Sequence, residues 1–273
     1  MPDQMTPEPA PRHLHGRVPF RARGFAPRDR AAAGAATLVG LVLLWQAGAS
    51  LGLIGTVFLP PPLAIARALA ALAANGQLWT QLAPSLDRLA TGWLLGTGAG
   101  LLVGFGVGTA TWVRSPARAV VSALFPIPKI ALVPLFIIWF GIGEGSKIAT
   151  LAFGVFFPTV LSTAAGVDGV PRNLVRMGQS FGLSRGAILR KIVLPGALPT
   201  ILAGFRVTTG IAIILLVAAE MIGADRGIGA FVLQAGNLYD TDNLLAGLVV
   251  LSLLGLGIAG ALTWLERFLL RWR

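Results

Sequence analysis

Two charged residues stand inside stretches that are otherwise apolar. Lys129 lies in FPIPKIALVPLF, and Glu220 lies in LLVAAEMIGA. A charge inside a membrane helix is costly, so it usually faces a wet cavity or a counter-charge. Both residues are therefore candidates for a translocation path or its gate. Two simpler interpretations fit the sequence equally well: the residues form a structural pair, or they extend to a membrane surface.

Patterns typical of catalytic or nucleotide-binding sites are weak in this sequence. Cysteine is absent, and both histidines, His13 and His15, lie near the start of the chain, so no Ser–His–Asp grouping is possible beyond them. GLGIAG at residues 255–260 matches a dinucleotide-binding pattern, but it lies within an apolar run instead of following a strand. GEGSK at residues 143–147 lacks the spacing of a phosphate loop. We expect no catalytic site, metal or cofactor in this chain.

Residues 170–199 form a polar, arginine-rich stretch between two apolar runs, which we call the polar segment. It is too polar to cross a bilayer, and its composition alone also fits a simple solvated loop. Pro171 suits the first turn of one short helix, Gly182 can end that helix, and Ser184 can cap another. We expect the second helix over residues 185–193, after which prolines should disturb the backbone.

The overall composition predicts an all-α polytopic membrane protein. Of the 273 residues, 55% are hydrophobic and 12% are charged, and the mean hydropathy is +0.77. This is too apolar for an ordinary soluble domain. A net charge of +11 would suit nucleic acid, but sixteen of the 22 lysines and arginines fall into groups separated by apolar runs. That placement favours the cytoplasmic face of a membrane over a nucleic-acid surface. The groups lie at residues 12–30, 114–118, 172–191 and 267–273.

We expect six membrane-spanning helices, with both termini in the cytoplasm. Basic groups then face the cytoplasm, and the loops on the other side are poor in cations. The third helix contains Pro126, Pro128 and Pro134, and a break at membrane depth is tolerated only where it is buried in protein or lines a cavity. Residues 112–119 should form a turn and residues 223–243 an external segment. The helices are expected at about residues 31–49, 86–111, 120–140, 147–167, 200–222 and 244–264.

This pattern divides the chain into four parts. Residues 1–30 should form a disordered basic cytoplasmic tail, and residues 31–58 the first spanning helix with an external turn. Residues 59–85 should be an external amphipathic segment near the membrane surface. Residues 86–273 should form the core, which includes the two short helices at 170–193.

A row of glycines marks the second expected spanning helix. Small residues spaced four apart let two helix backbones approach closely, so we expect this helix to pack against protein along much of its length. The drift of a four-residue period allows the packing partner to change between its ends. Asp87 and Arg88, just before the row, are expected at the outer surface. The glycines are Gly92, Gly96, Gly100, Gly104 and Gly108.

The polar segment also resembles a known cytoplasmic signature. Gly182 is followed, after nine residues, by Ile-Val-Leu-Pro at 192–195, similar to the glycine and I-x-L-P of ABC-importer permeases. From about residue 59 to 271 the chain resembles the nitrate, sulfonate and taurine branch, for example in FPIPKIALVPLFIIWFGIGEGSK (125–147), GVFFPT (154–159) and AAEMI (218–222). The resemblance implies a type I ABC importer permease (MetI-like) fold in the bacterial inner membrane.

The resemblance also implies partners. These are a second copy of the permease in a homodimer, two cytoplasmic ATPase subunits that bind the ATP, an external solute-binding protein, and membrane lipid. The polar segment would then supply coupling helices that sit in a groove of the ATPase. The residues expected at this contact are Leu174, Met177, Phe181, Gly182, Leu183, Ser184, Arg185, Ile192, Leu194 and Pro195.

The chain departs from the family pattern at one place. Permeases of this family usually carry Glu-Ala-Ala where this chain has Arg176, Met177 and Gly178.

The solute that the resemblance implies is a small anion such as a sulfonate, taurine or nitrate; a thiamine-related pyrimidine is the alternative. A passive channel would not need a coupling segment, and a membrane enzyme would need a polar catalytic cluster that the sequence does not contain.

Overall fold

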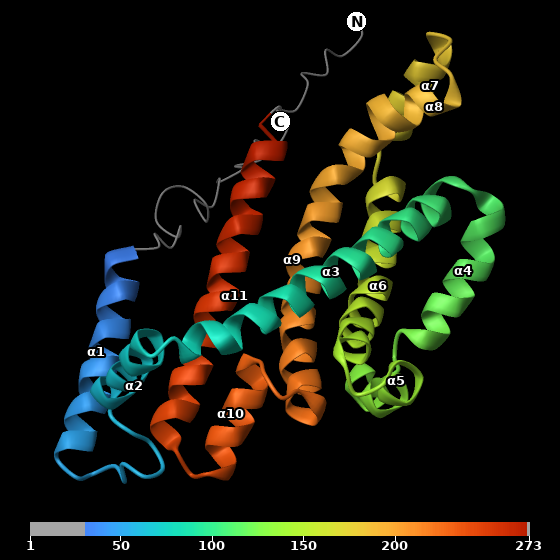
Figure 1. The fold of residues 1–273 in the computed structure, drawn as a ribbon. Helices are drawn as coiled ribbons and strands as arrows, with labels where there is room; N and C mark the ends of the chain where they lie inside the picture. Colours follow the sequence, from blue (N-terminus) through green and yellow to red (C-terminus); the bar gives the residue numbers. More distant parts are fainter. Residues whose placement is uncertain (1–30, 272–273) are drawn as a thin grey trace, which may run out of the picture. The chain divides into compact units, whose positions relative to one another are not determined.

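The computed structural model describes residues 31–271, and every regular element in that range is a helix (Figure 1). The predicted all-helical class is confirmed. The chain divides into two compact units, residues 1–44 and residues 45–273. Helix α1 (Ala31–Ser50) begins in the first unit, and the other helices belong to the second. The expected tail at residues 1–30 lies outside the described part.

Several helices are longer or more numerous than the sequence indicated. Helix α3 begins at Gln77 instead of residue 86, and the expected external segment at 223–243 contains a packed helix, α10. The second unit contains α2 (Pro62–Ala74), α3 (Gln77–Thr109), α4 (Thr111–Leu124), α5 (Val133–Phe140), α6 (Glu144–Asp168), α7 (Arg172–Ser180), α8 (Arg185–Ile188), α9 (Leu194–Gly223), α10 (Ile228–Asn237) and α11 (Thr241–Leu269), with a 3₁₀ turn at Lys129–Leu132 and a π turn at Leu189–Val193.

The expected number of six spanning helices is not reached in the described residues. Four helical spans are long and apolar enough to cross a membrane, or five if a bent pair counts as one span. Helix α1 has 20 residues in all, about the length that a membrane crossing needs, and its stretch Gly34–Ser50 is apolar but is not among the counted spans. The four are Gln77–Thr109, Glu144–Asp168, Arg185–Gly223 and Thr241–Leu269.

The bent pair is the expected broken helix. Thr111–Leu124 and Lys129–Phe140 meet at 88°, because Pro126 and Pro128 cannot continue the hydrogen-bond pattern of a helix. The turn expected at residues 112–119 is wrong, since α4 already begins at Thr111. Only Ala110, in an extended conformation, separates α3 from α4.

Helix α3 packs mainly against α6, and the glycine row makes this approach possible. A β-carbon built on Gly96 would lie 2.8 Å from the Ala152 Cα atom, and one on Gly100 would lie 2.7 Å from the Thr159 Cβ atom. Gly92, Gly104 and Gly108 meet α6 in the same way, against Leu151, Thr163 and Val167. A single partner therefore covers all five glycines, and the partner does not change along the helix.

Candidate functional site

The polar segment folds as two helices joined by a tight turn. Gly182 has φ of +70°, a conformation that a β-carbon disfavours. The Leu183 N–H donates to the Gly178 carbonyl at 3.0 Å, which completes the end of α7. The Ser184 hydroxyl accepts the Ala187 N–H at 3.3 Å and caps α8. The helix end at Gly182 and the cap at Ser184 both occur as predicted.

An apolar cluster fixes the polar segment to the rest of the second unit. Leu183 and Ile192, both expected to face a partner, instead pack against this cluster. Burying each large aliphatic side chain contributes about 1.5–3 kcal/mol, so the turn and the second helix are firmly attached. The buried members are Val170, Ile188, Val193, Ala197 and Ile201.

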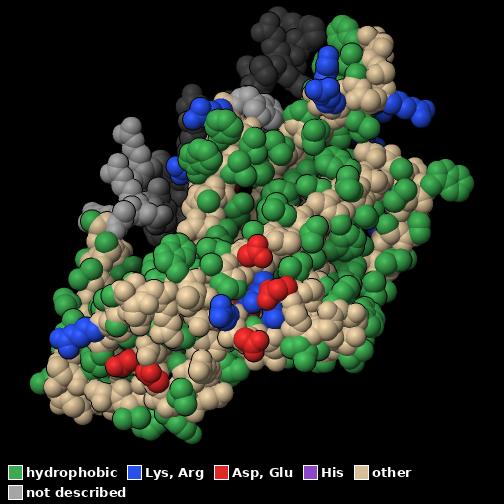
Figure 2. All heavy atoms as spheres, viewed as in Figure 1, with side chains coloured by type: hydrophobic (Ala, Val, Ile, Leu, Met, Phe, Trp, Pro, Cys, Tyr) green, Lys and Arg blue, Asp and Glu red, His purple; other side chains and the backbone are tan. Residues whose placement is uncertain are grey.

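Most of the other expected contact residues are exposed, and three of them are large apolar side chains of α7 and its C-terminal end. Leu174, Met177 and Phe181 are 40%, 50% and 78% exposed, and their spacing of three and four places them along one face of α7. Figure 2 shows arginine and lysine side chains at the same end of this unit. An apolar helix face with a basic border is the kind of surface that binds in a groove of another protein.

The second helix of the polar segment continues directly into α9. The Leu194 N–H donates to the Leu189 carbonyl, five residues back, and this closes one π turn. The wider turn accommodates Pro195, which has no N–H and would crowd a regular α-turn. The expected disturbance of the backbone occurs as this π turn before Pro195, but the expected break between the second short helix and the next spanning helix is wrong, because Arg185–Gly223 forms one helical span.

At the other end of α3, α6 and α9, polar side chains form a network that we call the ionic cluster. Arg88 and Glu220 are only 3% and 1% exposed. The Arg88 guanidinium donates to the two Glu144 oxygens at 2.5 and 2.7 Å and to Glu220 Oε1 at 2.7 Å. One arginine thus joins three helices. The cluster consists of Ser85, Arg88, Glu144, Lys147 and Glu220.

The Glu220 carboxylate is held from several sides. Besides Arg88, the Ser85 hydroxyl donates to Oε1 at 2.7 Å, and the Gly229 N–H donates to Oε2 at 2.8 Å. Gly227 has φ of +140°, and a β-carbon there would lie 2.5 Å from a carboxylate oxygen. The turn before α10 therefore wraps closely around Glu220, whose charge is fully compensated by donors.

The structure separates the two candidate path residues. Glu220 pairs with Arg88, whereas the Lys129 ammonium donates to the Phe125 carbonyl and lies 4.8 Å from the centre of the Phe125 ring. The two are therefore not a pair with each other. Lys129 is partly exposed at the bend between α4 and α5, and its role as a path residue stays a prediction.

Sequence reasoning missed Arg88, which was expected at the outer surface and is buried. A signal was present, because Arg88 lies four residues before Gly92 and so continues the glycine row on the buried face of α3. Its partner Glu144 was passed over within the rejected GEGSK motif. Lys147, in the same motif, is 5% exposed, and its Nζ atom lies 3.8 Å from Glu144 Oε1.

Comparisons with known proteins agree on one class. Residues 96–271 match the family described as "Binding-protein-dependent transport system inner membrane component". The chain is 38% identical to the taurine transport system permease protein TauC of Escherichia coli (strain K12), over 86% of this chain and 88% of that protein. It is 34% identical to the putative aliphatic sulfonates transport permease protein SsuC of Bacillus subtilis (strain 168), over 85% of this chain and 84% of that protein.

A solved structure supports the fold. The inward-facing MetNI methionine ABC transporter contains a chain that matches with a TM-score of 0.61 and 24% identity, over 70% of this chain and 95% of that chain. The MetI-like fold expected from the resemblance is thereby confirmed.

Proposed function

Because the chain belongs to the binding-protein-dependent transport system inner membrane component family, we propose that it imports its solute by ATP-driven alternating access, with ATPase subunits bound to the polar segment. The chain is the membrane permease of an ABC importer. The observation that carries the coupling proposal is the apolar face of α7, where Leu174, Met177 and Phe181 are exposed beside the firmly attached turn and second helix.

The continuous span from α8 through α9 provides a physical route for the coupling. Arg185–Gly223 contains 39 residues and is therefore about 58 Å long at 1.5 Å per residue. One end carries the polar segment, and the other carries Glu220 of the ionic cluster. A movement imposed on α7 and α8 by the ATPase would tilt this helix as a unit, so the two ends would respond together.

We propose a small sulfonate as the solute. The relatives named above are a taurine permease and a putative aliphatic sulfonate permease. Lys129 suits an anion, because it is the cation at the break in the α4–α5 span and none of its contacts within residues 31–271 is an acid. An external binding protein would deliver the solute, and two copies of the permease would enclose the path.

The proposed orientation places both termini and the polar segment in the cytoplasm. The basic groups at residues 114–118, 172–191 and 267–273 would then lie on one side of the membrane, as the positive-inside rule requires. The ionic cluster would lie towards the external side.

Cross-linking tests the proposed contact directly. The chain contains no cysteine, so Met177→Cys creates a single thiol on the exposed face of α7. In membranes that contain the co-expressed ATPase, a short reagent with one thiol-reactive and one amine-reactive end should join this thiol to an amino group of the ATPase subunit.

Trp79→Cys is the matched control, because Trp79 is 66% exposed on α3, at the end that carries the ionic cluster. It should give no product with the ATPase. Equal products from the two variants, or labelling of Met177→Cys by a membrane-impermeant reagent added outside intact cells, would refute the proposal.

A further inference from the structure

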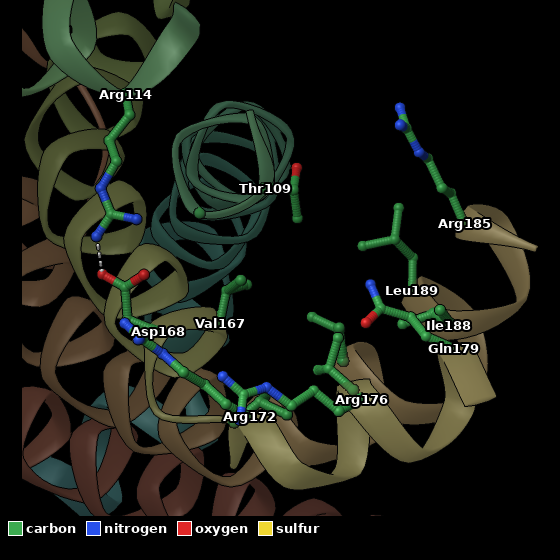
Figure 3. Close-up of a pocket in the computed structure, with 14 residues that line it drawn as sticks. Thr109, Arg114, Val167, Asp168, Arg172, Arg176, Gln179, Arg185, Ile188 and Leu189 are labelled. Atoms are coloured by element: carbon green, nitrogen blue, oxygen red, sulfur yellow. Dashed lines mark hydrogen bonds and ion pairs between the residues drawn. The ribbon is translucent and has the colours of Figure 1, made fainter. Parts of the chain in front are cut away.

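A basic pocket lies between the polar segment and the helix bundle. Its volume is about 560 Å³, and its walls come from the ends of α3 and α6, the start of α4, and helices α7 and α8. Figure 3 shows these walls enclosing an open space. We call it the arginine pocket, because Arg114, Arg172, Arg176 and Arg185 all line it.

The positive charges of the pocket are largely uncompensated. Asp168 is the single acid among the lining residues, and it already pairs with Arg114 at 2.5 Å and with Arg118 at 3.3 Å. Arg172, Arg176 and Arg185 form no ion pair within residues 31–271. Like charges placed together repel each other, so a concave site of this kind attracts anions.

The guanidinium groups come from opposite walls. In Figure 3, Arg172 and Arg176 extend from α7 along the floor of the pocket towards Asp168, which Arg114 of α4 reaches from the other side, whereas Arg185 of α8 points away from them. Gln179 adds a side-chain amide on the same wall as Arg176. The pocket therefore offers planar, multidentate donors from two elements, the arrangement that suits a tetrahedral oxyanion.

We propose that the arginine pocket binds a multivalent oxyanion of the sulfate or phosphate type, either free in solution or as the headgroup of an anionic phospholipid. Both sources present the same tetrahedral group, and basic pockets between helix ends on the cytoplasmic side of membrane proteins bind lipid headgroups. Arg176 lines the pocket at the position where the family usually has a glutamate. A glutamate there would remove one cation and add a charge that repels an anion.

A bound anion would hold the polar segment against the helix bundle at this pocket. It would connect Arg172 and Arg176 of α7 to Arg114 of α4, and so favour whichever state of the transporter keeps these arginines close. The binding step itself needs no ATPase, so its test is separate from the test of coupling.

The first measurement uses the purified full-length chain in phosphatidylcholine nanodiscs. Calorimetric titration with sodium sulfate and with sodium phosphate, at ionic strength held constant with sodium chloride, should show saturable binding. Arg172→Gln and Arg176→Gln should each weaken it about tenfold or more, because each removes a charge-assisted hydrogen-bond donor. Arg176→Glu should abolish it.

Arg190→Gln is the matched control, because Arg190 is an exposed arginine of the same segment that does not line the pocket. It should bind like the wild type. Arg176→Lys keeps the charge without the planar fork, and should bind with an intermediate affinity.

A second arm identifies a lipid source. Native mass spectrometry of protein extracted from phosphatidylglycerol-containing membranes should show retained anionic lipid that Arg176→Glu loses and Arg190→Gln keeps. Saturable binding of sulfate or phosphate in the first arm supports the site with a free anion as its ligand. Selective lipid retention in the second arm supports the site with a lipid headgroup as its ligand. If neither arm distinguishes the pocket variants from Arg190→Gln, the proposal is overturned.

Discussion

The two ends of the α9 span differ in where their charged side chains lie and in what compensates them. In the ionic cluster, Arg88 and Glu220 are buried and each carboxylate oxygen of Glu220 has a donor. In the polar segment, the charged side chains are exposed, and large apolar side chains such as Phe181 are exposed beside them. Figure 2 shows mixed acidic and basic side chains on one part of the unit, and basic side chains without acids around α7 and α8.

This difference indicates that the ionic cluster stabilises the fold, whereas the polar segment is available to bind a partner. A buried network with all partners internal contributes to holding helices together, and its members are costly to remove singly. An exposed apolar surface contributes little to the isolated chain and is available to a partner. We therefore expect changes in the ionic cluster to lower the free energy of unfolding, and changes in the polar segment to leave the protein folded but inactive.

The largest effect is expected for Arg88→Met. This change leaves the Glu220 carboxylate buried without its counter-charge, and should lower the free energy of unfolding by about 3–5 kcal/mol. Chemical denaturation in nanodiscs measures it, with the exposed Arg190→Met as control. The double variant Arg88→Met, Glu220→Met should recover part of the loss. Equal stability of Arg88→Met and Arg190→Met would remove the distinction between the two ends.

A smaller loss is expected when the close approach of α3 and α6 is blocked. Gly96→Leu places side-chain atoms where a β-carbon alone would lie 2.5 Å from Val155 Cγ2, and should cost about 1–3 kcal/mol of unfolding free energy. Gly98→Leu is the matched control on the same helix, because nothing lies within 4 Å of a β-carbon there. The same denaturation experiment compares them, and equal losses would show that the glycine row does not set the α3–α6 packing.

Gly182→Val should have a still smaller effect on stability but a clear effect on coupling. The left-handed conformation at Gly182 costs a residue with a β-carbon about 1–2 kcal/mol, so the turn between α7 and α8 should rearrange. The solute imported per ATP hydrolysed by the reconstituted complex should fall severalfold. Gly186→Val, at a helical position with open space around its β-carbon, should keep the wild-type ratio. An unchanged ratio in Gly182→Val would contradict a coupling role for this turn.

Local signals in the sequence were sufficient for the turn between the two short helices of the polar segment. Gly182 and Ser184 act through backbone conformation and near-neighbour hydrogen bonds, so residue type and spacing predict them directly. The glycine row predicted close helix packing for the same reason, although only the structure shows that α6 is the single partner.

The ionic cluster could not be assembled in the same way. Glu144 and Glu220 lie 56 and 132 positions after Arg88 along the chain, and no local pattern specifies which charges meet. The continuity of α9 was also missed, because Pro195 normally interrupts a helix and only the π turn before it prevents that. Long-range pairing and backbone adjustment both depend on tertiary packing.

The most direct test of the coupling account is the double variant Met177→Ser, Phe181→Ser in the reconstituted permease–ATPase complex. Both side chains are at least half exposed, so the free energy of unfolding should change by less than about 0.5 kcal/mol. Losing apolar anchors from a protein interface costs about 2 kcal/mol or more, so ATPase binding and ATP-driven solute uptake should fall more than tenfold. Phe58→Ser, at a residue 88% exposed outside the polar segment, should leave both unchanged. Normal uptake by the folded double variant would contradict the central claim that the ATPase acts through this face of α7.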